Sequence, residues 1–140
     1  MNALLMVEGL GKRYRSGGED LTVLDGVGFS LASGESLAVV GPSGSGKSTL
    51  LGLIAGLDTP SGGRVVVDGQ DLALLNEDAL AAFRGRRLGF VFQSYRLLPT
   101  LTAEENVRVP LELAGHDDAR ATALAWLERV GLSARAGHQP

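Results

Sequence analysis

The sequence predicts an α/β fold in which a phosphate-binding loop joins a buried strand to a buried helix. Residues 36–40 form a short apolar run typical of a core strand, and residues 49–55 read as a buried helix that ends at Gly56. Between them, the stretch 41–49 contains the pattern G-x-x-x-x-G-K-S/T at residues 41–48. This pattern binds phosphate when a strand precedes it and a helix follows it, so a chance match in a glycine-rich loop is the weaker interpretation.

The residue types of this loop suit a polyphosphate ligand. Glycine lacks a Cβ, so backbone N–H groups can converge on phosphate oxygens, and the following helix adds the positive end of its dipole. Lys47 supplies a mobile positive charge for the β- and γ-phosphates, and the Ser48 hydroxyl can coordinate Mg²⁺. The predicted binding residues are Gly41, Pro42, Ser43, Gly44, Ser45, Gly46, Lys47, Ser48 and Thr49. We therefore expect a nucleoside triphosphate with Mg²⁺ as the ligand.

Length and composition are those of one soluble domain. The 140 residues can bury about two-thirds of the unfolded surface, and 44% hydrophobic and 21% charged residues are ordinary proportions. A net charge of −3 offers no basic excess, so we expect no nucleic acid partner. The absence of cysteine fits a reducing cytoplasm. No apolar run approaches the roughly 18 residues of a membrane span, so no direct insertion into a membrane is expected.

The segments before the loop predict antiparallel strands. Residues 4–8 read as a first strand, and a polar loop at 16–20 separates them from a second strand that begins at 21–24. Residues 25–26 interrupt that strand, and apolar and small residues alternate over 27–31 as in a half-buried strand. We therefore expect an antiparallel β-subdomain that leads into the phosphate loop.

Residues after Gly56 predict a loop at 58–63, a strand at 64–67 and a helix capped by Asn76. That helix ends with three arginines, Arg84, Arg86 and Arg87. They could bind phosphate, but cations are favourable at any helix C-terminus, and we prefer that interpretation.

A second core strand is predicted at 88–92, and Gln93 leaves its C-terminal end, where ligand-facing groups gather in open α/β sheets. The strands at 36–40 and 88–92 would form part of a parallel core sheet. A capping box at 102–105 opens a helix that Pro110 must kink or restart. An amphipathic helix follows at 118–130, and we expect its Trp126 to serve in packing.

Three motifs in order give the chain a specific resemblance. Besides the loop at 41–49, residues 12–14 (Lys-Arg-Tyr) match an A-loop, and residues 91–93 (Val-Phe-Gln) match a Q-loop. Together they resemble the nucleotide-binding subunits of ATP-binding-cassette (ABC) transporters, a P-loop NTPase fold. Residues 89–94 and 97–107 look like the group of bacterial ABC ATPases that serves lipoprotein release, macrolide export and cell division.

The resemblance implies a role for each motif. Tyr14 would stack on adenine, Lys47 would offset charge on the phosphoryl oxygens, and Gln93 would reach Mg²⁺ and the attacking water. The implied activity is ATP hydrolysis that drives transport or envelope work. The implied partners are a second ATPase subunit, in a homodimer, and a transmembrane permease. The permease would hold the subunit on the inner face of the plasma membrane.

The family's signature motif, Walker B strand and switch histidine are not in this sequence, and His138 does not match the last of these. We therefore interpret residues 1–140 as one ABC-type nucleotide-binding domain truncated just before the signature, and expect it to be inactive alone. Two alternatives are a P-loop kinase or GTPase and a non-catalytic remnant. Tyr14, Gln93 and the lack of an N-K-x-D motif argue against a kinase or GTPase.

Overall fold

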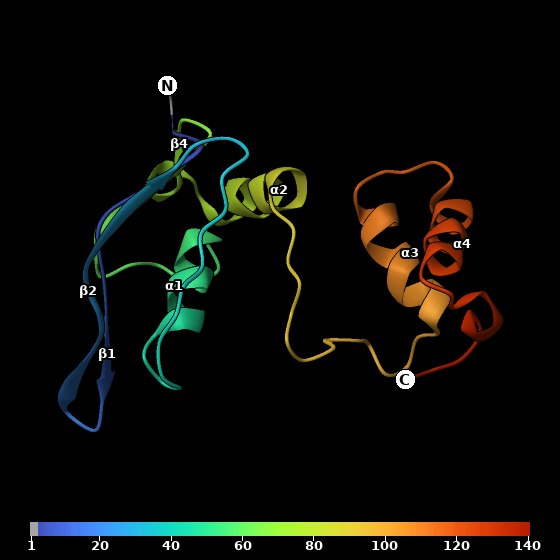
Figure 1. Cartoon of the computed structure of the whole chain (residues 1–140), viewed down its shortest axis with the longest axis horizontal. Coiled ribbons are helices and arrows are strands. Elements are labelled where there is room, and N and C mark those ends of the chain that lie inside the picture. Colours follow the sequence, from blue (N-terminus) through green and yellow to red (C-terminus); the bar gives the residue numbers. More distant parts are fainter. Residues whose placement is uncertain (1–2) are drawn as a thin grey trace. The chain divides into compact units, whose positions relative to one another are not determined.

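The computed structural model describes residues 3–140, which divide into two compact units. Unit 1 holds the described residues up to Gly89, and unit 2 is Phe90–Pro140. Unit 1 contains the sheet with helices α1 and α2, and unit 2 contains α3 and α4 (Figure 1). No helix in the described part of the chain is long and apolar enough to cross a membrane.

Unit 1 is built on a four-stranded antiparallel sheet in the order β2-β1-β3-β4. Its strands are β1 (Leu5–Ser16), β2 (Glu19–Leu31), β3 (Gly62–Val67) and β4 (Gln70–Asp71). The predicted antiparallel β-subdomain is therefore confirmed. The polar loop expected at 16–20 is only a tight turn at Gly17-Gly18.

The expected interruption of β2 at residues 25–26 is a bulge within one continuous strand. Leu10 of β1 pairs with Val27, but Lys12 pairs with Leu24, so the register shifts between them. Gly26 takes a φ of 63°, which a residue with a side chain rarely adopts. The bulge keeps the strand paired on both sides of the irregularity.

The core of unit 1 is made by apolar side chains from the sheet and from three helical elements. These are α1 (Lys47–Ile54), the short 3₁₀ helix η1 (Leu72–Leu74) and α2 (Glu77–Arg87). The buried core residues are Val7, Leu10, Leu24, Leu50, Leu53, Val65, Val67, Leu72 and Phe83. This packing fixes α1 against the sheet, and the N-terminus of α1 carries the phosphate loop.

Helix α2 has the predicted cap and uses its arginines within unit 1. The Asn76 side chain accepts a hydrogen bond from the N–H of Ala79. At the other end, Arg84 donates to the carbonyl of Gly56 at 2.7 Å. Arg87 forms an ion pair with Asp68 at 2.8 Å. These contacts support a structural role for the arginine cluster.

The two predicted core strands at 36–40 and 88–92 do not form. Neither segment belongs to a helix or strand among the described residues, and no parallel pair occurs in the described sheet. Val40 is 86% exposed and Val91 is fully exposed. A strand needs a neighbouring backbone to bond with. The described sheet consists of β1 to β4, and neither segment pairs with any of these strands.

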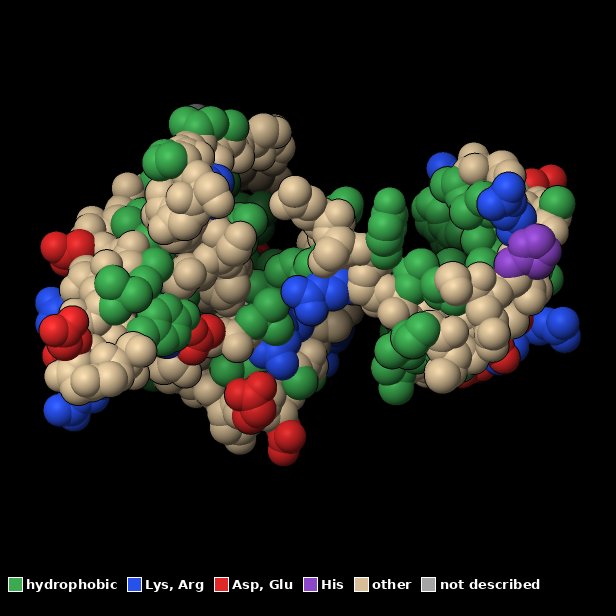
Figure 2. Space-filling view, turned by 90° about the horizontal axis from the view of Figure 1, so that it is seen from below, with side chains coloured by type: hydrophobic (Ala, Val, Ile, Leu, Met, Phe, Trp, Pro, Cys, Tyr) green, Lys and Arg blue, Asp and Glu red, His purple; other side chains and the backbone are tan. Residues whose placement is uncertain are grey.

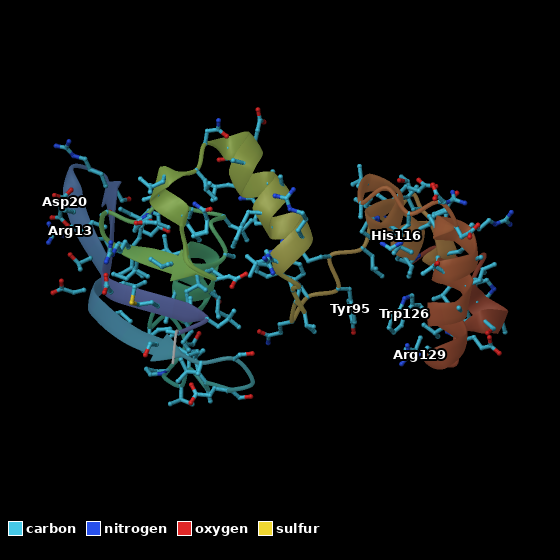
Figure 3. All side chains as sticks on the ribbon, turned by 90° about the horizontal axis from the view of Figure 1, so that it is seen from above. Arg13, Asp20, Tyr95, His116, Trp126 and Arg129 are labelled. Atoms are coloured by element: carbon cyan, nitrogen blue, oxygen red, sulfur yellow. The ribbon has the colours of Figure 1, made fainter. Side chains whose placement is uncertain are left out.

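Unit 2 is a helical hairpin of α3 (Ala103–Leu113) and α4 (Ala119–Arg129), followed by the 3₁₀ helix η2 (Ser133–Arg135). The capping box of Thr102 and Glu105 is present as predicted. Pro110 lies inside α3, which continues through it as one helix. Trp126 was expected to pack, but it is 49% exposed, with the Arg129 guanidinium 4.3 Å from its ring centroid (Figure 3).

Candidate nucleotide-binding site

The phosphate loop lies directly before α1, and the N-terminus of this helix has no side-chain cap. Gly46 is the N-cap residue, with φ 93°, and no side chain caps the helix. The backbone N–H groups of the first turn therefore have no capping side chain. A helix N-terminus of this kind attracts anions because its N–H groups and its dipole both favour negative charge.

Lys47 closes the loop with its own side chain. The ammonium donates to the carbonyl oxygens of Gly41 at 2.8 Å and Pro42 at 2.6 Å, and it lies 3.4 Å from the Ser45 hydroxyl. These bonds hold a positive charge over the loop. Because the bonds are exposed to solvent, the flexible side chain can exchange them for phosphate oxygens at low cost.

Close packing surrounds two glycines of the loop, and at Gly46 it requires glycine. A Cβ on Gly46 would lie 3.0 Å from the carbonyl oxygen of Val23, at a backbone φ that side chains disfavour. A Cβ on Gly41 would lie 2.7 Å from the Ser45 hydroxyl. Most of the predicted set is open to solvent: Gly41, Pro42, Ser43, Gly44, Ser45 and Ser48 are exposed, while Gly46, Lys47 and Thr49 are partly buried.

Tyr14 lies on β1 in the same unit and is hydrogen-bonded to the loop that follows α1. Its hydroxyl donates to Asp58 Oδ2 at 2.9 Å, and Lys12 Nζ lies 4.8 Å from its ring centroid. The hydrogen bond to the Asp58 carboxylate raises the pKa of Tyr14, and the positive charge of Lys12 opposes this rise. The Lys12 ammonium in turn lowers the pKa of Asp58.

Sequence reasoning gave no role to Lys12 or Asp58. In the sequence, Lys12 belongs to the A-loop match and Asp58 begins the predicted loop at 58–63. The two are 46 positions apart, and no local pattern links them. The tight loop that follows α1 brings them together.

Gln93 belongs to unit 2, in the exposed segment that follows residue 88. Figure 3 shows its neighbour Tyr95 on the same segment. The association of Gln93 with the phosphate loop stays a prediction.

The donor set near the loop fits Mg²⁺ carried by a triphosphate. No group of three or more His, Cys, Asp or Glu side chains suited to a metal occurs among the described residues. Mg²⁺ bound with nucleotide takes most of its ligands from phosphate oxygens and water, so a hydroxyl such as that of Ser48 can suffice. Ser48 is exposed in the first turn of α1, next to Lys47.

The chain is similar to known ABC transporter proteins. The family model described as ABC transporter matches residues 24–140. The lipoprotein-releasing system ATP-binding protein LolD of Chromohalobacter salexigens is 48% identical over 98% of this chain and 59% of its own length. LolD of Pseudomonas syringae pv. tomato is 51% identical over 99% of this chain and 62% of its own length. The macrolide export ATP-binding/permease protein MacB of Photorhabdus laumondii is 47% identical, with 22% of its length covered.

Solved structures give the same result. The ATP-binding cassette MJ0796, in a dimeric post-hydrolysis state bound to ADP and Pi, is 37% identical with a TM-score of 0.88. The match covers 97% of this chain and 61% of that one. A further dimeric structure of MJ0796 has a TM-score of 0.89.

The antiparallel sheet, the glycine loop at the start of α1 and Lys47 define a P-loop nucleotide-binding domain. The chain belongs to the ABC transporter family, within the group of ATP-binding subunits that includes LolD and MacB. This confirms the predicted fold class and family. It also favours the ABC interpretation over a kinase or a GTPase. The chain spans 59% and 62% of the length of the two LolD relatives.

Proposed function

We propose that this chain binds MgATP through the loop at 41–49 and that, in the complete protein, hydrolysis of that ATP drives transport or envelope work. The observation that carries the proposal is the ammonium of Lys47, held over an uncapped helix N-terminus by the carbonyls of Gly41 and Pro42. This arrangement offers positive charge and free N–H donors at one exposed place. A polyphosphate is the ligand that uses both.

The proposed roles follow from the charges and donors of these residues. Lys47 and the first turn of α1 stabilise negative charge on the phosphoryl oxygens, because phosphoryl transfer depends mainly on positioning and electrostatics. The hydroxyls of Ser48 and Thr49 add donors, and Ser48 would hold Mg²⁺, which neutralises phosphate charge when bound. Tyr14 offers its ring to adenine. By family resemblance, Gln93 would orient the attacking water and help to hold Mg²⁺.

We further propose two partners, a transmembrane permease and a second ATPase subunit in a homodimer. The support comes from relatives: one is named an ATP-binding/permease protein, and the structural neighbours are dimeric cassettes. The permease would hold the subunit at the inner face of the plasma membrane, on the cytoplasmic side.

The test is binding of a fluorescent ATP analogue with Mg²⁺, competed by ATP and by GTP. We expect saturable binding that prefers ATP and is lost in Lys47→Ala. The matched control is Arg64→Ala, which removes an exposed cation of β3 that is paired with Glu8 and should leave the affinity unchanged. Unchanged affinity in Lys47→Ala would contradict the assignment of the loop, and a preference for GTP would revive the kinase or GTPase alternative.

A further inference from the structure

Lys12 is the charged residue that unit 1 buries, at 8% exposure. A buried ammonium is costly unless each of its three N–H groups has a partner. Lys12 Nζ donates to Asp58 Oδ1 at 2.8 Å and to the carbonyl of Thr59 at 2.6 Å. Its remaining partner is the ring of Tyr14, whose centroid is 4.8 Å away. The three interactions use all three donors and fix the ammonium in place.

Asp58 completes the restraint on Tyr14. One carboxylate oxygen accepts from Lys12, and the other accepts from the Tyr14 hydroxyl at 2.9 Å. The carboxylate is itself held, because Oδ1 also accepts from the N–H of Thr59 at 2.7 Å. The ring of Tyr14 is thus fixed at its hydroxyl by Asp58 and at its face by Lys12. It remains 41% exposed, so part of its surface is free for a ligand.

The same contacts connect Tyr14 to α1. Asp58 follows this helix by a turn in which the N–H of Leu57 bonds to the carbonyl of Gly52 at 2.9 Å. The phosphate loop lies at the N-terminus of α1, and the anchor of Tyr14 lies just past its C-terminus. One short rigid element therefore separates the phosphate site from the aromatic ring.

We propose that Lys12 and Asp58 are positioning residues that hold Tyr14 as the stacking surface for the purine base of the bound nucleotide. This inference rests on the proposed function. Base stacking depends on the placement of the aromatic face, so a ring released from Lys12 and Asp58 stacks less well even though it is still present.

A purely structural role would have a different effect. The cluster also joins β1 to the loop at 58–61, where the Ser61 N–H already bonds to the Gly11 carbonyl at 2.9 Å and the Arg13 N–H to the Ser61 hydroxyl at 3.0 Å. If Lys12 only fastened this loop, its loss would weaken all ligands equally or none. A positioning role affects only ligands that carry a base.

The first experiment compares MgATP with magnesium tripolyphosphate, which has the phosphates without the base, on the full chain. Lys12→Met and Asp58→Asn should each weaken MgATP about three- to tenfold and leave tripolyphosphate unchanged. In a Tyr14→Ala background, neither substitution should weaken MgATP further. Glu8→Gln, which removes the exposed ion pair with Arg64, is the matched control and should change neither affinity.

Two outcomes would overturn the inference: equal weakening of both ligands, or the same loss of MgATP affinity with and without Tyr14. Failure of the proposed function is distinguishable, because the unsubstituted chain would then bind neither ligand, or Lys47→Ala would bind both as before.

A second measurement does not depend on nucleotide. In a Tyr95→Phe background Tyr14 is the single remaining tyrosine, so tyrosinate absorbance follows its ionisation alone. Asp58→Asn should shift that titration to lower pH, since the carboxylate that favours the neutral phenol is removed. An unchanged titration in a folded variant would show that Asp58 does not hold the ring.

Discussion

Both lysines of the chain, Lys12 and Lys47, lie in the candidate site. They differ in how firmly their ammonium groups are held. Lys47 is bonded to exposed loop carbonyls and can leave them for phosphate. Lys12 is buried, and its three donors are occupied by fixed partners. The long flexible stem of lysine suits the first role. The fixed position of Lys12 comes instead from its buried surroundings.

The ion pair of Lys12 and Asp58 makes stability depend on pH. Lys12 holds the pKa of Asp58 below its ordinary value, so the ionised carboxylate stabilises the folded state. That contribution is complete above the unfolded pKa of about 4. This stabilisation is lost as the pH falls through the lower pKa that Asp58 has in the folded chain.

We therefore expect the stability difference between the unsubstituted chain and Asp58→Asn to be constant near neutral pH and to shrink below about pH 4. Urea unfolding over a pH series measures this difference. Asp25→Asn, at an exposed position of β2, serves as the control. A difference that stayed constant down to pH 2 would show that Asp58 is not stabilised in its ionised form.

The residues of the site were predictable from sequence only where a local pattern specifies them. The spacing of Gly41, Gly46 and Lys47 within one loop predicts a phosphate site, and the structure places this loop at the start of α1 with the Lys47 ammonium bonded to its carbonyls. The partnership of Lys12 with Asp58 depends on how the loop after α1 returns to β1. Residue types along the chain do not contain that information.

Among the secondary-structure elements, too, features set by local residues were predictable and features set by distant partners were not. The caps at Asn76 and Thr102 were predicted correctly because a cap involves residues within about four positions of each other. The strands at 36–40 and 88–92 were predicted wrongly, although their composition is suitable. A strand depends on partners distant in the sequence, and composition does not supply them.

Removal of the α3 cap should destabilise unit 2. Thr102 Oγ1 accepts from the Glu105 N–H at 3.2 Å, and Glu105 Oε2 accepts from the Thr102 N–H at 2.8 Å. Thr102→Ala removes the first of these bonds and should cost about 1 kcal/mol. Hydrogen exchange at residues 103–106 should accelerate, whereas Thr122→Ala, within α4, should leave these amides unchanged. Unaltered exchange in Thr102→Ala would show that the cap contributes nothing.

Asn106 holds the turn before α3 with both ends of its amide. Its Oδ1 accepts from the Leu98 N–H at 2.8 Å, and its Nδ2 donates to the carbonyls of Leu98, Leu101 and Thr102 at 3.2, 3.1 and 3.0 Å. Asp at this position would place a carboxylate oxygen against three carbonyls.

Asn106→Asp should therefore loosen residues 98–102 more than Asn106→Ala, although Asp is the closer match in shape. Limited proteolysis of this turn, with intact mass as the readout, ranks the two variants. Equal cleavage rates would indicate that the Nδ2 contacts do not matter.

At the scale of the whole molecule, both units leave large apolar side chains in contact with solvent (Figure 2). Unit 1 exposes Leu37, Val40, Leu51 and Leu57, and unit 2 exposes Val91, Phe92 and Leu113. The apolar segments at 36–40 and 88–92, which were expected to pair in a core sheet, supply several of these residues. Exposed apolar side chains in such numbers mark either an interaction site or a tendency to aggregate.

We expect this surface to bind the dye ANS and to promote self-association as protein concentration rises. Val40, at 86% exposure, and the fully exposed Val91 are the most exposed members of the set, so Val40→Lys and Val91→Lys should lower dye fluorescence and shift sedimentation toward the monomer. Arg120→Lys, a charge-conserving change on α4, is the control and should change neither. Weak dye fluorescence from a monomeric, folded chain at high concentration would show that these side chains are covered in solution.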